Sequence, residues 1–518
     1  MATMPYFVLS PSTILSLGGL LRGSDKTAPT PTEDWRTATI DVVIPALNEA
    51  HNIVLCLASV ARQTVRPRRI ILVDDGSSDG TVERAKAFCA SQQIELIAIQ
   101  RRAPIGKTPT IKRQAREFDS DVEFILDADT VLESPNYIER TVQELYQGVG
   151  IASACGTILP QRSSDRLRAQ NDPDVRAFTA THPLAPAGGD DWLPTVRRGV
   201  TNMYREVLYV YLQRFVYRGQ MAFFGTTTNP VGCAVAYRRK YVRALFDYIS
   251  PILGDDLTNS EDIFIGFSML NEGYRNIQLS DVHARTVEPE IHKLPRQIYL
   301  WSSSFLQSCY YFDPLVRSPF KMIKRWMAQR RARWTSRAVE TARWHATTAT
   351  FGPAFPAGGG MGTGIGTNFG FTRRALPEAQ TPPGDVRPGA AVSNGRNHDR
   401  RVVREAYRQG FGRTRTESHG RPAGWILALS AAEKVFFPTT LLIMLLLRLW
   451  EELAVTIAGE TAICVAALMF VMKGRRLEFL LKGLAVTPVR YALLGSELIT
   501  IGRFASDLWI TKDRKWRK

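Results

Sequence analysis

Short apolar runs alternate with amphipathic stretches in the first part of the chain. The runs cover 40–45, 70–73, 94–99 and 122–126, and stretches with helical periodicity separate them. Buried strands that alternate with helices at this spacing are typical of a parallel sheet with helices on both faces. We therefore predict an α/β fold with a doubly wound sheet, in which ligands bind beyond the carboxyl ends of the strands.

The C-terminal part of the chain has a different pattern. Residues 425–450 contain the run FFPTTLLIMLLL, and Glu460 is the only charged residue between 453 and 472. Both segments are long enough to cross a bilayer. Charged residues interrupt the apolar pattern between 479 and 510. We predict this last segment either as a third span or as a helix at the membrane surface, and buried soluble helices are the alternative for the whole region.

Charge and composition narrow the classes of partner. The 518 residues include 66 Lys and Arg against 49 Asp and Glu, and the net charge of +17 favours anionic partners such as phosphates or acidic lipids. A hydrophobic content of 45% excludes a wholly disordered chain. The six cysteines are scattered without a CxxC pair, which argues against a zinc site or a disulfide framework.

Basic residues gather close to the apolar C-terminal segments. Residues 317–337 contain eight Lys and Arg and no acidic residue, interleaved with Trp326 and Trp334. Beside a bilayer, this composition predicts a surface for acidic lipids rather than for nucleic acid. Lys and Arg also follow residue 472 and fill the C-terminus. Because short basic loops stay in the cytosol, we predict a protein of the cell inner (plasma) membrane with its α/β domain on the cytoplasmic side.

A pair of carboxylates follows the fourth apolar run. Asp127 and Asp129 are separated by one residue at the end of this predicted strand. Their oxygens suit a hard divalent cation such as Mg2+ or Mn2+, which in turn bridges a diphosphate. By itself the pair is weak, because a solvated turn at a strand end has the same sequence.

Other polar residues end the first three runs at the same predicted edge of the sheet. Asp75 follows the second run, and Pro45, Asn48 and Glu49 follow the first. Their side chains and turn amides are placed to hydrogen bond a nucleoside. Lys107 lies just before a predicted helix, where its ammonium and the helix amides can meet a phosphate. One edge therefore offers ligands for a metal, a diphosphate and a nucleoside.

A further acidic cluster covers residues 254–262 and precedes the helical segment IFIGFSMLNEGY. Its carboxylates include Glu261 and Asp262. A carboxylate at a helix start stays ionised because of the helix dipole, and a general base for a sugar hydroxyl needs such a group. The alternative is an ordinary helix cap, which Ser260 with nearby acids also makes.

In combination, these residues carry a family resemblance. The motifs VVIPALNE, VDDGSSDGT, GK, DAD, SED, GY and TVEP occur in an order that resembles inverting family 2 glycosyltransferases with a GT-A fold, over about residues 38–305. With its membrane segments the chain is similar to processive synthases of hyaluronan, poly-N-acetylglucosamine, chitin and cellulose. The resemblance implies a GT-A, Rossmann-like catalytic domain plus C-terminal transmembrane helices.

The resemblance also implies roles for individual residues. Asp75 would contact the nucleoside, Asp127 and Asp129 would hold the diphosphate and Mg2+ or Mn2+, and Asp262, with Glu261 beside it, would be the catalytic base. Pro45, Asn48, Glu49 and Lys107 would complete the nucleotide-sugar site.

The acceptor site of the processive relatives also has a counterpart here. Gln297 and Trp301 match the first and last residues of a QxxRW motif, so Trp301 would stack on the acceptor sugar. Leu300 stands where that motif has Arg.

The predicted reaction is a single in-line displacement that inverts the anomeric centre. A nucleotide-sugar donor, expected to be a UDP-sugar, would give a β-glycoside on a glycan or lipid acceptor, in polysaccharide synthesis. Transfer of one sugar to a polyprenyl phosphate is the alternative within this class. An alternative from another class is a sugar-nucleotide-binding regulator without transfer. The acidic base and the Trp301 platform argue against that regulator, because a binding module needs neither.

Composition and motifs together divide the chain into five segments. We predict an N-terminal interfacial helix and linker (1–37), the GT-A domain (38–290), interfacial amphipathic and basic helices (291–349), a Gly/Pro-rich flexible linker (350–422) and a membrane region with two to three helices (423–518).

Overall fold

The computed structural model describes residues 10–22, 34–148, 150–183, 192–253, 260–350 and 421–511. The chain divides into a large unit, residues 1–321 with 398–518, and a small unit of residues 322–397. The small unit contains most of the long helix α14 (Ser318–Thr350). Of the predicted linker at 350–422, residues 351–420 lie outside the described residues.

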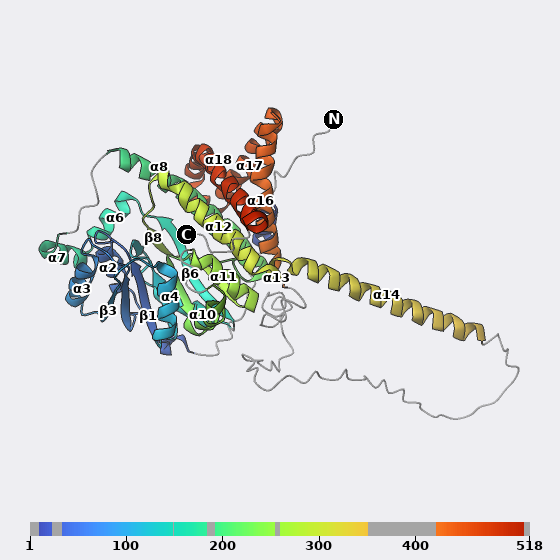
Figure 1. Cartoon of the computed structure of the whole chain (residues 1–518), viewed down its shortest axis with the longest axis horizontal. Helices are drawn as coiled ribbons and strands as arrows, with labels where there is room; N and C mark the ends of the chain where they lie inside the picture. The colour runs from blue at the N-terminus through green and yellow to red at the C-terminus, as the bar shows by residue number, and fades with distance from the viewer. Residues whose placement is uncertain are drawn as a thin grey trace, which may run out of the picture. The chain divides into compact units, whose positions relative to one another are not determined.

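The large unit is built on one eight-stranded sheet with the order β3-β2-β1-β4-β7-β6-β8-β5 (Figure 1). Its first four members in that order are parallel, as predicted, because helices connect β1 to β2, β2 to β3 and β3 to β4. β7 is antiparallel to both of its neighbours, so the sheet is mixed beyond β4. The strands are β1 (Ile40–Ala46), β2 (Arg69–Asp74), β3 (Leu96–Gln100), β4 (Val122–Leu126), β5 (Thr130–Leu132), β6 (Ile151–Pro160), β7 (Ala234–Arg238) and β8 (Arg275–Thr286).

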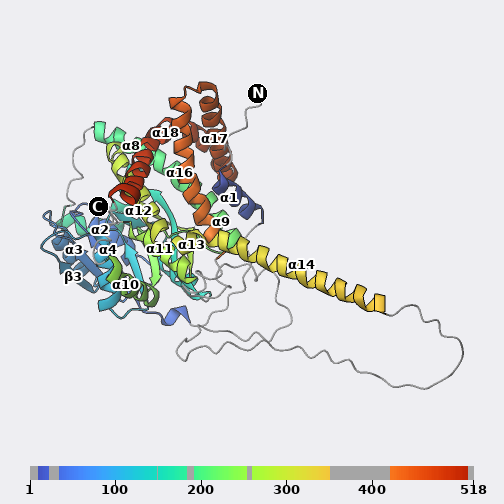
Figure 2. The ribbon, with the colours of Figure 1, turned by 45° about the vertical axis from the view of Figure 1, so that its right-hand side comes forward.

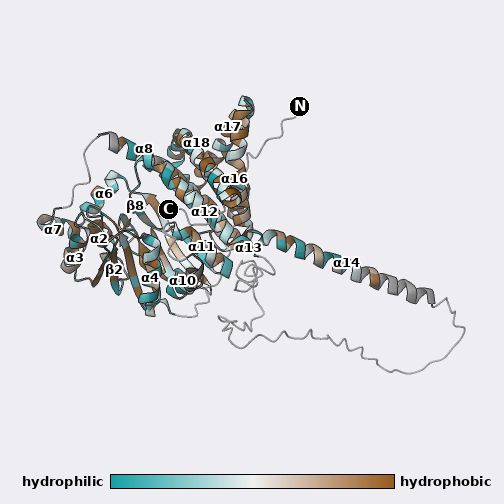
Figure 3. Cartoon of the chain, viewed as in Figure 1, coloured by the Kyte–Doolittle hydropathy of each residue, from teal (hydrophilic) through white to brown (hydrophobic). Residues whose placement is uncertain are grey.

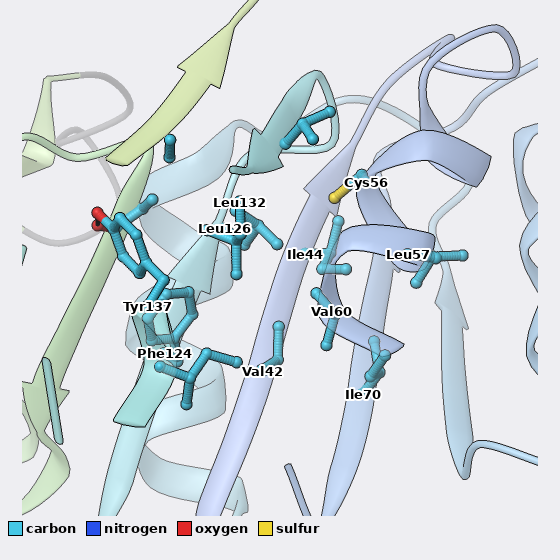
Figure 4. Packing of buried hydrophobic residues seen from close by; sticks show 14 of the residues in the cluster. Val42, Ile44, Cys56, Leu57, Val60, Ile70, Phe124, Leu126, Leu132 and Tyr137 are labelled. Carbon is cyan, nitrogen blue, oxygen red and sulfur yellow. Dashed lines mark hydrogen bonds between the residues drawn. The ribbon is translucent and has the colours of Figure 1, made fainter. Parts of the chain in front are cut away.

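Helices cover both faces of this sheet, which explains why its strands are apolar on both sides. On one face, Val42 and Ile44 of β1 pack against Cys56, Leu57 and Val60 of a helix (Figure 4). The other face packs against α4 (Lys107–Glu117), α10 (Arg239–Leu253) and α11 (Glu261–Glu272). The helices around the sheet are α2 (Ile53–Ala61), α3 (Thr81–Ser91), α4 (Lys107–Glu117), α5 (Tyr137–Tyr146), α6 (Ser163–Gln170), α7 (Pro173–Thr181), α10 (Arg239–Leu253) and α11 (Glu261–Glu272).

The helix expected directly after Asn48 begins only at Ile53. The intervening residues are held by the loop after β2 instead. The amide of Asn48 donates to Ser77 Oγ at 2.8 Å, and the amide of Ala50 donates to Asp79 Oδ2 at 2.9 Å. Asn48 has a φ of 57°, a left-handed conformation that asparagine tolerates better than most residues. These bonds replace the first turn of the expected helix.

Three helices in the C-terminal region are long and apolar enough to cross a membrane, within the described part of the chain. They are α16 (Gly424–Leu446), α17 (Trp450–Val471) and α18 (Arg476–Ser506), and hydrophobic residues recur along α16 and α17 in Figure 3. The third segment is one continuous helix. Its Arg490 pairs with Glu460 of α17, to which Tyr491 also donates a hydrogen bond at 2.9 Å.

The part of the chain built on the sheet packs on these helices through α8 (Trp192–Val210) and α12 (Leu294–Tyr311) (Figure 2). An apolar cluster joins Tyr204 and Val207 of α8 and Ile298 of α12 to Leu468 of α17 and Phe479 of α18. The N-terminal helix α1 (Pro11–Arg22) packs nearby on the π-helix η2 (Tyr211–Tyr217) and α9 (Arg218–Phe224). Short helices η1 (Trp35–Thr37), η3 (Ile291–Lys293), α13 (Asp313–Val316), η6 (Lys473–Arg475) and η7 (Asp507–Thr511) complete the described elements.

Candidate active site

A cavity of about 550 Å³ opens beyond the carboxyl end of β4. The strand order reverses next to this strand, between β1 and β4, and such a topological switch point is where open α/β sheets bind ligands. Elements far apart in the sequence line the cavity, namely the start of α4, the turn between β4 and β5, the start of α11 and one face of α12. They bring together the predicted residues Lys107, Asp127, Asp129, Glu261, Asp262, Gln297 and Trp301.

Lys107 is the cation that joins two of the acidic motifs. Its Nζ lies 2.6 Å from Asp127 Oδ1 and 3.1 Å from Glu261 Oε1, and it donates to the Gly232 carbonyl at 3.0 Å. The preceding Gly106 has a φ of 97°, which only glycine adopts without strain. Burial lowers the pKa of Lys107, but the carboxylates of Asp127 and Glu261 outweigh burial and raise it. The ammonium is therefore fixed in its charged form.

Asp127 and Asp129 accumulate negative charge that Lys107 does not balance. Burial, the Asp127 carboxylate and the Glu49 carboxylate raise the pKa of Asp129 to about 8. Burial also raises the pKa of Asp127, although Lys107 opposes that shift. The described residues contain no group of three or more His, Cys, Asp or Glu side chains that would hold a metal alone. Two carboxylates fit a hard divalent cation whose remaining ligands are diphosphate oxygens and water.

Asp262 lies in the first turn of α11, next to Ser260, whose φ of 51° is left-handed. The Asp262 side chain packs directly on Gly232. A Cβ added to Gly232 would lie 2.9 Å from the Cβ of Asp262, so only glycine fits there. Burial and the neighbouring Glu261 carboxylate raise the pKa of Asp262 to about 7, and Lys107 opposes them. A carboxylate with this pKa is suited to accept a proton near neutral pH. Residues 254–259 of the acidic cluster lie outside the described residues.

The residues expected to bind the nucleoside lie at the ends of β1 and β2 and are not among those that line this cavity. Pro45 is within β1. The Asp75 carboxylate accepts hydrogen bonds from the amides of Ile105 at 3.0 Å and Gly106 at 2.8 Å. In this structure Asp75 thus holds the loop that leads to Lys107.

Asn48 and Glu49 are also engaged with neighbours. Asn48 Oδ1 accepts from the Ser78 amide at 3.0 Å, and Glu49 Oε2 accepts from Asn52 Nδ2 at 2.8 Å. Burial, Asp79 and Asp127 raise the pKa of Glu49, whereas the Asn52 bond lowers it. Glu49 is therefore close enough to the cavity to interact with its carboxylates.

Gln297 and Trp301, the residues of the predicted acceptor site, contact an arginine that the sequence did not single out. Arg205 of α8 is fully buried, stacks on the Trp301 ring at 4.5 Å and donates a hydrogen bond to Gln297. Its Nε lies 3.3 Å from Glu288 Oε2. Leu300 also lines the cavity, without a charge of its own. A guanidinium from α8 thus lies beside the two motif residues whose expected arginine is missing. α8 also contains Arg197, Arg198 and Glu206, so nothing in the sequence distinguished Arg205 from the other charged residues of the helix.

The central part of the chain matches the sequence model of a known family. Residues 41–246 match the sequence model of glycosyl transferase family 2. An undecaprenyl-phosphate 4-deoxy-4-formamido-L-arabinose transferase of Pectobacterium carotovorum subsp. carotovorum is 30% identical over 132 residues, 25% of this chain and 39% of that protein. The transferase of the same name from Yersinia enterocolitica is 27% identical over 139 residues, 26% of this chain and 41% of that protein. The chain thus spans about two fifths of the length of these relatives.

The similar solved structures have low sequence identity to this chain. The mannosyltransferase PcManGT from Pyrobaculum calidifontis, in complex with GDP-Man and Mn2+, is 14% identical, covers 96% of this chain and 94% of its own, and has a TM-score of 0.43. Glucosyl-3-phosphoglycerate synthase from Mycobacterium tuberculosis is 16% identical over 53% of this chain and 79% of its own, with a TM-score of 0.32. The chain has a GT-A, Rossmann-like α/β sheet with mixed strands, and its match to glycosyl transferase family 2 covers residues 41–246.

Proposed function

We propose that the chain is a membrane-bound inverting glycosyltransferase that transfers a sugar from a nucleotide-sugar donor to a hydroxyl of a membrane-borne acceptor. One observation carries this proposal. A carboxylate with a pKa of about 7, a fixed ammonium, a pair of strand-end carboxylates and a tryptophan share one cavity of about 550 Å³. These are the groups that deprotonation of an acceptor, neutralisation of a diphosphate and stacking of a sugar require.

The reaction we propose is a single displacement. Asp262 accepts the proton of the acceptor hydroxyl, and the hydroxyl oxygen forms a bond to the anomeric carbon of the donor. The bond between that carbon and the phosphate oxygen breaks, and the nucleoside diphosphate leaves with its electron pair. Lys107 is placed to balance part of the negative charge of the departing diphosphate. One displacement inverts the anomeric centre, so an α-linked donor gives a β-glycoside.

Asp127 and Asp129 are the residues that would hold Mg2+ or Mn2+. Bound there, the cation supplies positive charge that stabilises the leaving diphosphate. Burial is the main reason that the pKa of Asp129 is raised to about 8, and the Asp127 carboxylate adds to it. A divalent cation would offset the charge of these carboxylates and of the diphosphate, so we expect metal and donor to bind more tightly together than separately.

The chemistry of Asp262 bears on the acceptor. A hydroxyl must lose a proton to react, whereas a phosphate oxygen of a lipid phosphate is already ionised and needs no base. A retained base with a raised pKa therefore favours a hydroxyl acceptor, in a single transfer or in polysaccharide synthesis. Direct transfer to a polyprenyl phosphate is the second candidate, because the relatives in Pectobacterium and Yersinia are named as undecaprenyl-phosphate transferases.

The orientation follows from the charges around the apolar helices. The basic turn between α17 and α18 contains Lys473, Arg475 and Arg476. Short basic loops remain in the cytosol. We therefore propose that the GT-A domain faces the cytoplasm, with acidic lipids as the expected contact of the basic segment 317–337.

The test is nucleotide release by the full chain in nanodiscs of its native lipids, across a panel of UDP-sugars with Mn2+ or Mg2+. We expect release from one UDP-sugar that Asp262→Asn lowers about 10²- to 10⁴-fold, the factor typical for loss of a general base. Sizing the product separates a single transfer from a polymer. Undiminished release by Asp262→Asn with a phosphate-linked product would favour the second candidate, and no metal-dependent release from any UDP-sugar would refute the donor assignment.

A further inference from the structure

A second cavity, of about 540 Å³, lies next to the catalytic one. Val287 lines both, so the two cavities are neighbours. The second cavity is formed by α6 with the residues before it, by α8, and by α18 of the apolar C-terminal region. It is lined by His51, Gln161, Arg162, Ser163, Arg166, Thr195, Arg198, Gly199, Asn202, Met203, Glu206, Val287 and Lys482.

The charge of this second cavity is strongly positive. Among the described residues that line it, Glu206 is the only carboxylate, against three arginines and Lys482. Glu206 is buried and already shared. Arg162 donates a hydrogen bond to its Oε2, and Lys482 Nζ lies 2.6 Å from the same atom. Glu206 therefore serves both Arg162 and Lys482, and Lys482 Nζ also lies 2.6 Å from Glu478 Oε1. Among the residues that line the cavity, three arginines and Lys482 still outnumber this one carboxylate.

Arg166 and Arg198 are the two arginines of the cavity that form no ion pair with Glu206 in the described contacts. Arg166 donates hydrogen bonds to two neutral oxygens, Asn52 Oδ1 and the His51 carbonyl, both at 2.6 Å. Burial and the nearby Arg198 guanidinium lower the pKa of Arg166. Two guanidinium groups close enough to disfavour each other's charge are stabilised by an anion bound between them.

The position of Lys482 links the second cavity to the membrane region. Lys482 belongs to α18, a helix long and apolar enough to cross a membrane. A lysine in such a helix is costly in lipid and is expected to face a functional cavity. Here it reaches Glu206 of α8, so the cavity has the catalytic domain on one side and an apolar helix on the other.

We propose that the second cavity binds a phosphate group carried by the acceptor, while a hydroxyl of the same molecule enters the catalytic cavity. This inference rests on the proposed function. It assigns the acceptor to one class, a molecule with a phosphate close to a reactive hydroxyl, such as a lipid-linked phosphosugar or a glycerophospholipid. An arginine guanidinium binds a phosphate group through two parallel hydrogen bonds. The adjoining α18 provides an apolar surface for a lipid chain.

Direct binding to the full-length protein in detergent tests this inference without need of transfer. The probes are dihexanoyl phosphatidic acid, dihexanoylglycerol as its neutral analogue, and inorganic phosphate, each measured by calorimetry. We expect saturable binding of phosphatidic acid and not of dihexanoylglycerol. Arg198→Gln should weaken that binding about tenfold or more, the factor for one charge-assisted hydrogen bond. Lys482→Met, on the opposite wall, should weaken it as well.

Arg197→Gln is the matched control. Arg197 is the neighbour of Arg198 on α8, its guanidinium lies 3.9 Å from Glu290, and it is not among the residues that line the second cavity. We expect Arg197→Gln to bind phosphatidic acid as the wild type does. Equal weakening by Arg197→Gln and Arg198→Gln would mean general attraction of anions to a basic surface and would overturn the proposal. Absence of saturable binding to the wild type would overturn it too.

The two phosphate probes separate the possible sources of the group. Phosphatidic acid bound more tightly than inorganic phosphate supports a lipid headgroup, whereas equal affinities support a soluble phosphorylated acceptor. Sugar transfer by a wild type that binds neither probe would leave the proposed function standing and overturn this inference. Binding of phosphate that Arg198→Gln abolishes, without nucleotide release from any donor, would support the anion site and count against the proposed function.

Discussion

Asp262 should give the enzyme a sharp loss of activity on the acid side of neutrality. Burial and the Glu261 carboxylate raise its pKa to about 7, and a base works only when it is deprotonated. With a pKa of about 7, the deprotonated fraction falls about 25-fold between pH 7.5 and pH 5.5. An aspartate with an ordinary pKa near ~3.9 would lose almost nothing over that range. The apparent second-order rate constant, kcat/KM for the donor, should follow the deprotonated fraction.

Glu261→Gln tests the cause of this raised pKa. The substitution keeps the shape of the side chain but removes the carboxylate that repels the charge of Asp262. The limb of the pH profile should therefore move to lower pH, by about one unit for the loss of one neighbouring charge. Lys107 keeps its contact with Asp127 at 2.6 Å, so its charge remains in place to favour ionised Asp262.

The assay is nucleotide release from the active UDP-sugar, measured from pH 5 to pH 9 in native-lipid nanodiscs at fixed metal concentration. Asp281→Asn is the control. Asp281 is an acidic residue on β8 whose carboxylate lies 2.8 Å from the Arg140 guanidinium, and neither residue lines the cavity. Its profile should match that of the wild type. Full wild-type activity down to pH 5, or a limb that Glu261→Gln leaves in place, would refute the reasoning.

Three further outcomes follow from contacts described above. Gly232→Ala should lower activity at least about tenfold with the fold retained, as judged by melting temperature, because the new Cβ would lie 2.9 Å from the Cβ of Asp262 and displace it; wild-type activity would contradict the close packing. Tyr137→Phe should lower the free energy of unfolding by about 1–3 kcal/mol, because the buried Gly156 amide loses the hydroxyl it donates to at 2.7 Å; an unchanged denaturation midpoint would count against that bond. Metal-free protein should melt at a lower temperature at pH 8 than at pH 5, because the raised pKa of Asp129, about 8, means that stability is lost as the pH rises through it. Asp129→Asn should reduce this dependence, and an equal slope in both proteins would contradict it.

The acidic motifs could be located from the sequence because a general rule of topology places them. Asp127, Asp129 and Lys107 each follow or precede a regular element, and parallel strands bring such positions to one edge of the sheet. The proximity of Lys107 and Asp127 could therefore be predicted from the positions of these residues next to their strands and helices. Asp262 joins them because α11 packs on the same sheet, which only the family resemblance indicated.

Contacts between distant helices could not be predicted in this way. The pattern left α18 undecided between a span and a surface helix, because Arg490 and Glu497 interrupt its apolar residues. In the structure these charges are paired, Arg490 with Glu460 and Glu497 with Lys434, the latter at 3.0 Å. The pairing of Glu206 with Lys482 likewise joins residues 276 positions apart. A pattern read along one helix contains no information about which charges another helix will neutralise.

The packing of α12 between the catalytic cavity and the apolar helices has a consequence for kinetics. Trp301 and Gln297 line the cavity from the same helix whose Ile298 packs with Leu468 of α17. With α17 embedded in a bilayer, the cavity is held at a constant height above the membrane surface and meets its acceptor by lateral diffusion in two dimensions. The rate should then depend on the mole fraction of acceptor among the lipids rather than on its bulk concentration. Diluting the nanodisc lipids with an inert phospholipid should slow the enzyme even when the total amount of acceptor is unchanged.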